Sequence, residues 1–409
     1  MAKTVYIVTV GTGTAGRHSN LAQGLVNAIG RRQPERAVLV PSTSADSVAL
    51  AELVADELGR HAPPVSAEMG ARLSAPDDFL ACRREMRRVL QAIRAADPTA
   101  QVVVNPTSGT KQMTAAALVA CLDEGLGAVE FIAGERSDGV VKTGTERLAQ
   151  VDGRRLQAEQ ALRNALVLLE HGDFAGAAAL TAAFGGLFPR SAAAAAMLAA
   201  WQRFAYAGAL QAACGAAELA DCRRALDTLR HAPEVSPERA ADLLNLAERE
   251  FLYQRPEEAL SALYRAVELL ARLRLSELGV TAENCVAENL CHHPQLSLAP
   301  RLARSLRAQQ EHFGPGSPLS LGLQITLDLL RNTSFALNDL DSAQRTVLFA
   351  RNRTRFGHGV QYVDSAAVGR LLQAVRDLAA RQWPDLAGLQ QAFAFPDVAT
   401  LIRQELDHD

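Results

Sequence analysis

The stretch QVVVNPTSGTKQMTAAA, residues 101–117, decides the fold class of the first part of the chain. An aliphatic run leads into a loop of Pro, Thr, Ser and Gly, and an alanine-rich helical pattern begins at Lys111. Nearly continuous aliphatic runs are typical of strands that helices cover on both faces, as in a parallel sheet. The stretch therefore predicts one strand–loop–helix step of an α/β domain.

The same pattern recurs on both sides of this stretch. Further strands are expected at TVYIVTV (4–10), RAVLV (36–40) and AVEFIAG (128–134), and a short one at GVVKTG (139–144). Helices are expected over residues 19–31, 46–59, 77–96 and 111–124. Together these elements predict a Rossmann-like domain with a parallel sheet over residues 1–150.

From about residue 150 onward helical periodicity takes over, and the rest of the chain is expected to be all-α. Gly and Pro cluster at several breaks, among them HAPEVSPER (231–239). This break predicts a helical linker domain over 151–235 and a second helical domain over 236–409.

Composition limits the classes of function. The 409 residues carry a formal net charge of -3, so a nucleic-acid partner must be bound by a local basic site. No apolar run is long enough to span a membrane and no secretory cleavage site is seen, so a cytoplasmic protein is expected. The six cysteines have no framework spacing, and CVAENLCHH (285–293) lacks the CxxC and HxxxH spacings of zinc sites, so no metal site is predicted.

Three predicted strands end in small, hydroxyl-rich loops: GTGTAG, PSTS and NPTSGT. In a parallel sheet these ends share one edge, where backbone N–H groups and helix N-termini favour phosphates. The candidate ligand-binding residues are Gly11, Thr12, Gly13, Ser42, Thr43, Ser44, Asn105, Thr107, Ser108, Gly109, Thr110 and Lys111.

Two familiar nucleotide motifs are not supported. GTGTAG lacks the acidic residue expected about 20 positions on in dinucleotide-binding proteins, since only Glu35 precedes the next strand. NPTSGTKQMT lacks the earlier glycine and the adjacent Gly-Lys of a P-loop. Neither a dinucleotide cofactor nor ATP hydrolysis is predicted.

A second polar cluster, RNRTRFGHG (351–359), follows the apolar run TVLFA. If one helix continues through both, Arg351, Arg355 and His358 share a face, because their spacing is i, i+4 and i+7. Such a stripe is cationic and exchanges protons near neutral pH. The alternative reading is a solvated helix face. Gly357 and Gly359 loosen the helix end and indicate close approach of another backbone or an RNA strand.

NPTSGTKQMTAAA resembles the signature of CARF (CRISPR-associated Rossmann fold) domains, with Pro106, Thr107, Gly109, Thr110 and Lys111 on the motif positions. VTVGTG is similar to the first loop of that family. The resemblance implies a sensor of cyclic oligoadenylates, which are made during type III CRISPR interference, and a dimer that binds the ring across its two-fold axis.

RNRTRFGHG in turn is similar to the Arg-x(4-6)-His motif of HEPN ribonucleases, with Arg351, Asn352 and His358 as the implied catalytic residues. ALSALYRAVELLARLRL (259–275) resembles the helix that precedes this motif in CARF-HEPN proteins. The two resemblances imply an antiviral effector: a homodimeric, metal-independent endoribonuclease that needs no cofactor, is activated by cyclic oligoadenylate and cleaves single-stranded RNA through its 2'-hydroxyl.

Two questions stay open at this point. Arg353 with His358 also satisfies the shortest form of the motif, and Arg353 and Arg355 stand where relatives tend to carry small or apolar residues. The alternative function is a non-catalytic sensor of the CARF type that recruits a partner through its helical half.

Overall fold

The structure is a computed structural model that describes residues 3–12, 18–62, 64–126, 128–137, 140–296, 298–314 and 316–407. The chain divides into two compact units, Met1–Ala161 and Leu162–Asp409, and the division falls inside helix α5, Gly153–Glu170. The predicted boundaries near residues 150 and 235 stay predictions.

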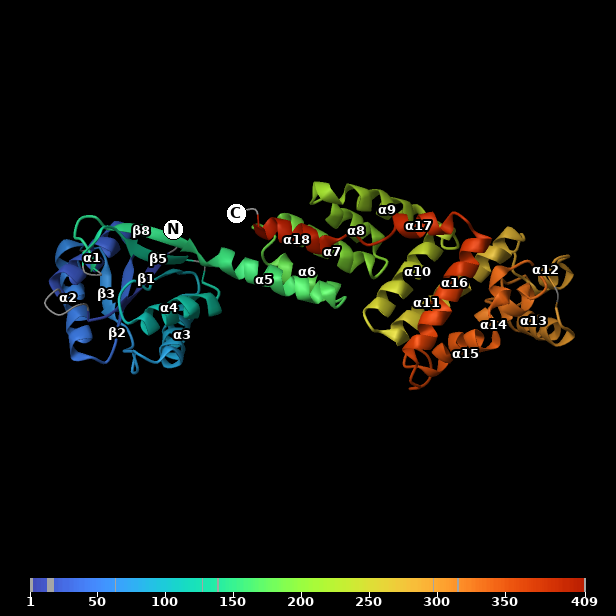
Figure 1. The fold of residues 1–409 in the computed structure, drawn as a ribbon, viewed down its shortest axis with the longest axis horizontal. Coiled ribbons are helices and arrows are strands. Elements are labelled where there is room, and N and C mark those ends of the chain that lie inside the picture. Colours follow the sequence, from blue (N-terminus) through green and yellow to red (C-terminus); the bar gives the residue numbers. More distant parts are fainter. Residues whose placement is uncertain are drawn as a thin grey trace. The chain divides into compact units, whose positions relative to one another are not determined.

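The first unit is built on a six-stranded sheet in the order β3-β2-β1-β4-β5-β8 (Figure 1). Its strands pair in parallel except β8, which runs antiparallel to β5. The strands are β1 Thr4–Val10, β2 Arg36–Pro41, β3 Ser66–Met69, β4 Gln101–Asn105, β5 Ala128–Ala133 and β8 Arg147–Asp152, and a separate ribbon pairs β6 Arg136–Ser137 with β7 Val140–Val141.

Helices cover both faces of this sheet, so the unit has three layers. The helices are α1 His18–Arg32, α2 Ala45–His61, α3 Phe79–Ala96 and α4 Lys111–Asp123. Alternate residues of β1 enter different cores: Tyr6 and Val8 pack with residues of α1 and α2, whereas Val5 and Ile7 pack with residues of α3 and α4. The predicted Rossmann-like α/β fold is confirmed.

Two strands of the six-stranded sheet were not expected from the sequence. β3 is only four residues long and lies at one edge of the sheet, and β8 lies at the other edge with an exposed, polar pattern, RLAQVD. Both lack the aliphatic run that identifies a strand buried on two faces.

The second unit is helical, as predicted. After α5 its helices are α6 Phe174–Ala182, α7 Pro189–Trp201, α8 Tyr206–Ala213, η1 Ala217–Leu219, α9 Ala220–His231, α10 Pro237–Leu252, α11 Pro256–Glu277, α12 Ala287–His292, α13 Pro300–Phe313, α14 Leu323–Leu330, η2 Ala336–Asp339, α15 Ser342–Ala350, η3 Arg351–Arg353, α16 Ser365–Gln382, α17 Leu386–Ala392 and α18 Val398–Asp407. Four of them begin with proline at the first position, where its missing N–H costs no hydrogen bond.

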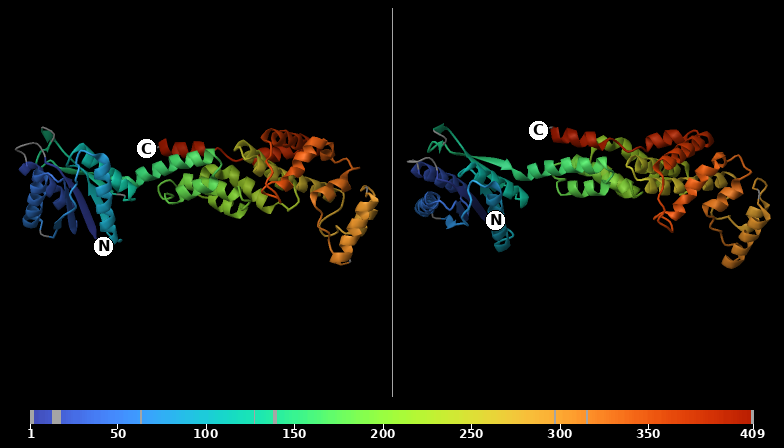
Figure 2. Two further views of the ribbon diagram at one scale, coloured as in Figure 1. Left: turned by 90° about the horizontal axis from the view of Figure 1, so that it is seen from below. Right: turned by 60° about the horizontal axis from the view of Figure 1, so that its bottom comes forward.

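Long-range contacts join the ends of this unit. Helix α18 packs against α7 (Figures 1 and 2). The carboxylate of Glu405 accepts hydrogen bonds from the backbone N–H groups of Arg190 (3.2 Å) and Ser191 (2.8 Å). This carboxylate supplies the cap that Phe188, at the N-cap position of α7, does not provide.

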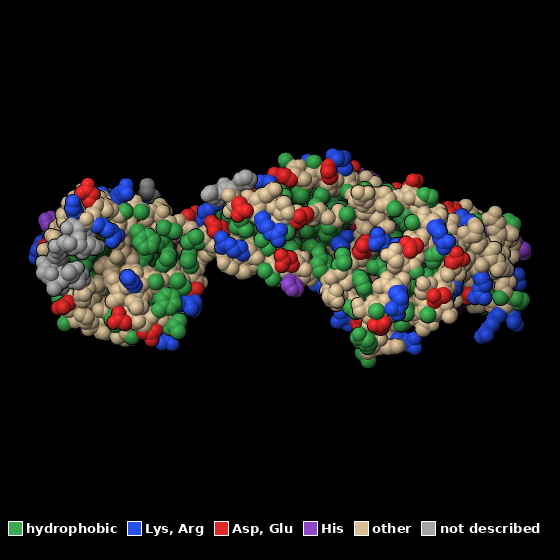
Figure 3. Space-filling view, viewed as in Figure 1, with side chains coloured by type: hydrophobic (Ala, Val, Ile, Leu, Met, Phe, Trp, Pro, Cys, Tyr) green, Lys and Arg blue, Asp and Glu red, His purple; other side chains and the backbone are tan. Residues whose placement is uncertain are grey.

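Helices α10 and α11 form an extensive pair, and α11 also contacts α14, α15 and α16. Positive and negative side chains are interspersed over the face of the molecule shown in Figure 3, in keeping with the small net charge. Within the described ranges, every helix is too short or too polar to pass through a bilayer.

Candidate functional site

The loops after β1, β2 and β4 meet at one edge of the sheet, as predicted. These three strands are parallel neighbours, so their carboxyl ends lie together. Helices α2 and α4 begin directly after the second and third loops, at Ala45 and Lys111. Their first backbone N–H groups therefore face the same edge, which suits an anionic ligand.

The loops after β1 and β4 touch backbone to backbone. The N–H of Gly11 donates to Oγ of Ser108 at 3.0 Å, and a Cβ at Gly11 would lie 2.5 Å from Cα of Gly109. Gly109 has φ +126°, a conformation that side chains rarely adopt. Glycine is required at position 11 because of this contact, and at position 109 because of its backbone conformation.

Several predicted residues are buried and hold the third loop in place. Asn105 donates to the hydroxyl of Tyr6 at 2.8 Å and accepts from the N–H of Thr107 at 3.0 Å. Oγ1 of Thr107 accepts from the N–H of Ile132 at 2.8 Å. Burial raises the pKa of Tyr6, so this phenol stays a neutral partner of Asn105.

The second loop is held in a similar way. The N–H of buried Ser42 donates to Oγ of Ser47 (2.9 Å), which donates to the carbonyl of Val10 (2.7 Å). Oγ of Ser42 accepts from the N–H of Ser44 at 3.3 Å. The hydroxyl of Ser42 therefore shapes the loop and is not presented to solvent.

The remaining candidate residues at this edge differ in exposure. Thr110 is partly buried and caps α4, since its side chain accepts from the N–H of Met113 at 3.2 Å. Thr12 is also partly buried, and Gly13 lies outside the described residues. The exposed members, which are available to a ligand, are Thr43, Ser44, Gly109 and Lys111.

At the other candidate site the predicted continuous helix is wrong. Helix α15 ends at Ala350, residues Arg351–Arg353 form a short 3-10 turn, and the chain then folds back on itself. Thr354 is fully buried with an extended backbone, and both its N–H (3.1 Å) and its hydroxyl (2.9 Å) donate to the carbonyl of Arg351. These local bonds replace the next helical turn.

The fold-back brings His358 next to Asn352. The N–H of His358 donates to the carbonyl of Asn352 at 2.8 Å, and the N–H of Gln361 donates to the carbonyl of Arg353 at 2.8 Å. A Cβ at Gly357 would lie 2.5 Å from the same Asn352 oxygen. The close backbone approach expected at the glycines is therefore made by the segment itself. Arg351, Asn352 and His358 are grouped by a turn and not by a helical stripe.

Helix α11 supports the arginine and asparagine of this turn. The guanidinium of Arg351 lies 5.2 Å from the centre of the Tyr264 ring, and its Nε is buried without a hydrogen-bond partner. Tyr264 stacks edge-to-face on Phe349 with ring centres 6.2 Å apart. Burial raises the pKa of Tyr264, and the Arg351 charge and a hydrogen bond with the Asn352 side chain partly oppose this rise.

The three arginines of the turn have different surroundings. Arg355 forms ion pairs with Glu257 (3.0 Å) and with Glu258 at the start of α11, so it anchors the turn. Arg353 and His358 are exposed, and Arg351 is only partly exposed. Tyr264 was not predicted as a site residue, although it is the single aromatic residue of the helix that resembles the one before the HEPN motif.

Among the described residues, no group of three or more His, Cys, Asp and Glu side chains is placed to hold a metal ion. The two histidines of CVAENLCHH bond to backbone carbonyls of their own region, His292 to Glu288 (3.0 Å) and His293 to Leu278 (2.8 Å).

The chain was compared with protein-family models, curated protein sequences and solved structures. Residues 234–382 match the family model described as the Csm6 HEPN domain. No curated protein sequence matches the chain. Among solved structures, Enterococcus italicus Csm6 bound to cyclic hexa-2'-fluoro-hexa-dAMP is similar over 99% of this chain and 100% of that chain, with a TM-score of 0.60 and 14% sequence identity. At that identity the likeness shows the fold. The chain therefore carries a region that matches the Csm6 HEPN domain at residues 234–382, and this region follows an α/β domain with a Rossmann-like fold.

Proposed function

We propose that this protein is an endoribonuclease of type III CRISPR defence that cyclic oligoadenylate activates. The observation that carries the proposal is the fold-back turn in a domain that matches the Csm6 HEPN family. Its backbone joins His358 to Asn352, and its Arg351 lies against Tyr264. The similar Csm6 of known structure was bound to a cyclic hexanucleotide analogue, which supports a cyclic oligoadenylate as the activator.

The side chains that this turn carries suit RNA cleavage by internal attack. The 2'-oxygen of the substrate attacks the adjacent phosphorus, the bond to the 5'-oxygen breaks, and a 2',3'-cyclic phosphate and a 5'-hydroxyl result. His358 is exposed, and histidine is the side chain that most often transfers protons in enzymes, so it suits proton transfer in this step. Arg351 offers a planar cation to the phosphate oxygens, and Asn352 orients the phosphate or the histidine. The nucleophile comes from the substrate itself, so the mechanism requires no metal ion.

The activator is proposed to bind at the carboxyl edge of the sheet. Lys111 contributes a positive charge, Thr43 and Ser44 contribute exposed polar groups, and the starts of α2 and α4 contribute backbone N–H groups. Gating requires that the ring binds the active state more tightly than the idle one.

Activity is proposed to need a homodimer. One turn carries one histidine on an exposed surface, and pairing two copies about a two-fold axis would create a composite cleft. A monomer that cleaves RNA as fast as the native assembly would refute this part.

The decisive experiment is an RNA cleavage assay in EDTA, with and without cyclic tetra-adenylate or hexa-adenylate. We expect the wild-type protein to cleave single-stranded RNA only with one of these rings and the His358→Ala variant to be inactive with both. Absence of cleavage under every ligand would instead favour a sensor that recruits a partner. In a parallel arm, Lys111→Gln is expected to raise the activator concentration needed, without changing the maximal rate.

A further inference from the structure

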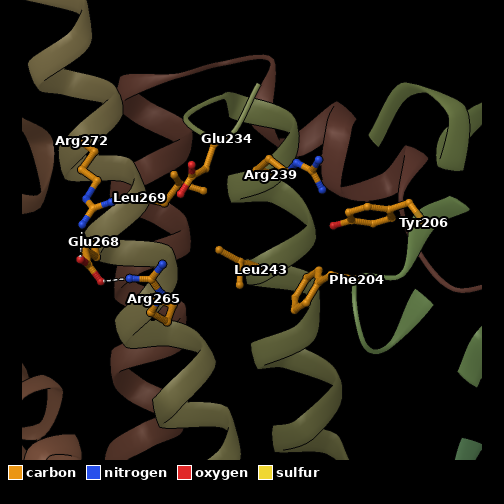
Figure 4. A pocket seen from close by; sticks show the side chains of 9 residues that line it. All are labelled: Phe204, Tyr206, Glu234, Arg239, Leu243, Arg265, Glu268, Leu269 and Arg272. Atoms are coloured by element: carbon orange, nitrogen blue, oxygen red, sulfur yellow. Dashed lines mark hydrogen bonds and ion pairs between the residues drawn. The ribbon is translucent and has the colours of Figure 1, made fainter. Parts of the chain in front are cut away.

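A cavity of about 440 Å³ lies beside helices α10 and α11, apart from the Arg351–His358 turn (Figure 4). Its apolar wall consists of Phe204, Leu243 and Leu269, and its polar groups come from both helices and from Tyr206 and Glu234. This volume lies in the range of sites for small ligands. Nothing in the proposed cleavage step uses these side chains.

The charged groups of the cavity leave a surplus of positive charge. Arg265 and Arg272 both pair with Glu268, the latter at 2.8 Å, and Glu268 is only 8% exposed. One carboxylate thus serves two guanidinium groups. With Arg239 and Glu234, the cavity is lined by three arginines and two glutamates.

Arg239 has an incompletely satisfied guanidinium. Its group stacks over the Tyr206 ring at 4.5 Å, and its Nε is buried without a hydrogen-bond partner. The nearby acidic residue, Asp242, is fully buried and already accepts from Tyr206 (2.7 Å) and Trp201 (3.2 Å). The Nη2 of Arg239 donates to the carbonyl of Ala232 at 3.4 Å, and its remaining donors are available to an anion.

Phe204 is the second unusual residue of this cavity. It follows α7 in a left-handed conformation, φ +57°, where its N–H donates to the carbonyl of Trp201 at 2.8 Å. Glycine favours this position after a helix, and a side chain is disfavoured. The chain nevertheless carries an aromatic ring here, 36% exposed, and Figure 4 shows it beside Leu243, on the side of the cavity opposite Arg265. Retained local strain of this kind is typical of binding sites.

We propose that this cavity binds a nucleotide, with the base against Phe204 and Leu243 and the phosphate on the arginines. Flat apolar walls stack a base, and guanidinium groups pair with phosphate oxygens. A neighbouring cavity of about 540 Å³ shares Glu234 and Arg272 with the first and offers room for an adjoining nucleotide. Helix α11 also carries Tyr264, which lies against Arg351, directly before Arg265. We therefore expect the bound nucleotide to be part of an RNA strand, a choice that rests on the proposed function. The alternative ligand is a free mononucleotide.

Binding, not cleavage, tests this proposal. The full-length His358→Ala variant is titrated with uridine monophosphate, inorganic phosphate and a short oligouridylate, which contains no adenine and so does not imitate the activator. The same titrations are then repeated with a double variant that carries Phe204→Gly together with His358→Ala. We expect nucleotide binding to weaken about tenfold or more, because a stacked base contributes about 1–3 kcal/mol. The melting temperature should not fall, because glycine suits φ +57°.

Two further variants sharpen the result. Arg265→Gln is expected to weaken binding of both nucleotide probes, and Phe313→Ala, which removes another exposed ring, is expected to leave binding unchanged. Binding of oligouridylate well above that of the mononucleotide supports the RNA source, and equal binding supports a free nucleotide. The proposal is overturned if neither probe binds, if Phe204→Gly binds as its parent does, or if phosphate alone competes as well as uridine monophosphate. If the wild-type protein does not cleave RNA but nucleotide binding still depends on Phe204, only the proposed function is refuted.

Discussion

Replacing Gly357 by alanine is expected to loosen the Arg351–His358 turn without unfolding the protein. The added Cβ would lie 2.5 Å from the carbonyl oxygen of Asn352, which is 0.9 Å short of an ordinary 3.4 Å contact. That oxygen accepts the N–H of His358 at 2.8 Å, so a retreat of 0.9 Å would lengthen this bond to 3.7 Å, beyond hydrogen-bonding distance. The N–H of Gly357 itself donates to Thr354 and would move as well.

Two lost hydrogen bonds correspond to about 2 kcal/mol, or at most about a 30-fold fall in the fraction of molecules that hold the turn. The loss is local, so the melting temperature should change little. Activator-dependent cleavage of a fluorescent RNA should fall by up to the same factor, and hydrogen exchange at the His358 amide should accelerate.

The matched control is Gly388→Ala in α17, where an added Cβ meets nothing within 4 Å. This control should cleave RNA like the wild type and melt slightly higher, because alanine favours a helix interior. Equal exchange rates at His358 in Gly357→Ala and wild type would refute the reasoning, whatever the activity.

Three further outcomes are expected. Arg351→Lys keeps the charge but loses the planar guanidinium, so the cleavage rate should fall at least about tenfold with little change in melting temperature. An unchanged rate would indicate that Arg353, and not Arg351, is the arginine used in cleavage. Burial raises the pKa of Cys121 to about 12 from 9.0, so the free energy of unfolding should fall above pH 9, because the thiol then ionises only in the unfolded chain. In urea denaturation, the free energy of unfolding of the wild type should fall by about 1.4 kcal/mol per pH unit more than that of Cys121→Ala. Equal pH dependence in the two proteins would contradict this. Glu405→Ala should cost about 1 kcal/mol in the same assay, since it uncaps α7, and Glu405→Gln should recover part of that loss.

Much of the α/β fold could be predicted from the sequence because its strands are buried on both faces. The aliphatic runs at Thr4–Val10 and Gln101–Asn105 coincide with β1 and β4. Edge strands carry no such run, since one side of each pairs with no strand, and β3 and β8 were therefore missed. Hydrophobic periodicity reports burial, and only indirectly strand pairing.

The candidate active site shows a different limit. Helical spacing grouped Arg351 with His358, but a turn made by Thr354 and two glycines is what brings the backbones of Asn352 and His358 together. Turn hydrogen bonds depend on single residues and override periodicity over so short a stretch. The contact between Arg351 and Tyr264 joins residues 87 positions apart, as the numbers 351 and 264 show, and no local pattern reports it.

The backbone contact between Gly11 and Gly109 has a consequence for how this protein diverges. Gly11 and Gly109 meet backbone to backbone and the Ser108 hydroxyl joins the same loops, so a residue inserted into one loop would collide with the other. Homologues should therefore change the lengths of these loops together. The loop after β2, which meets the β1 segment through the Ser47 side chain and the Val10 carbonyl, should vary in length more independently.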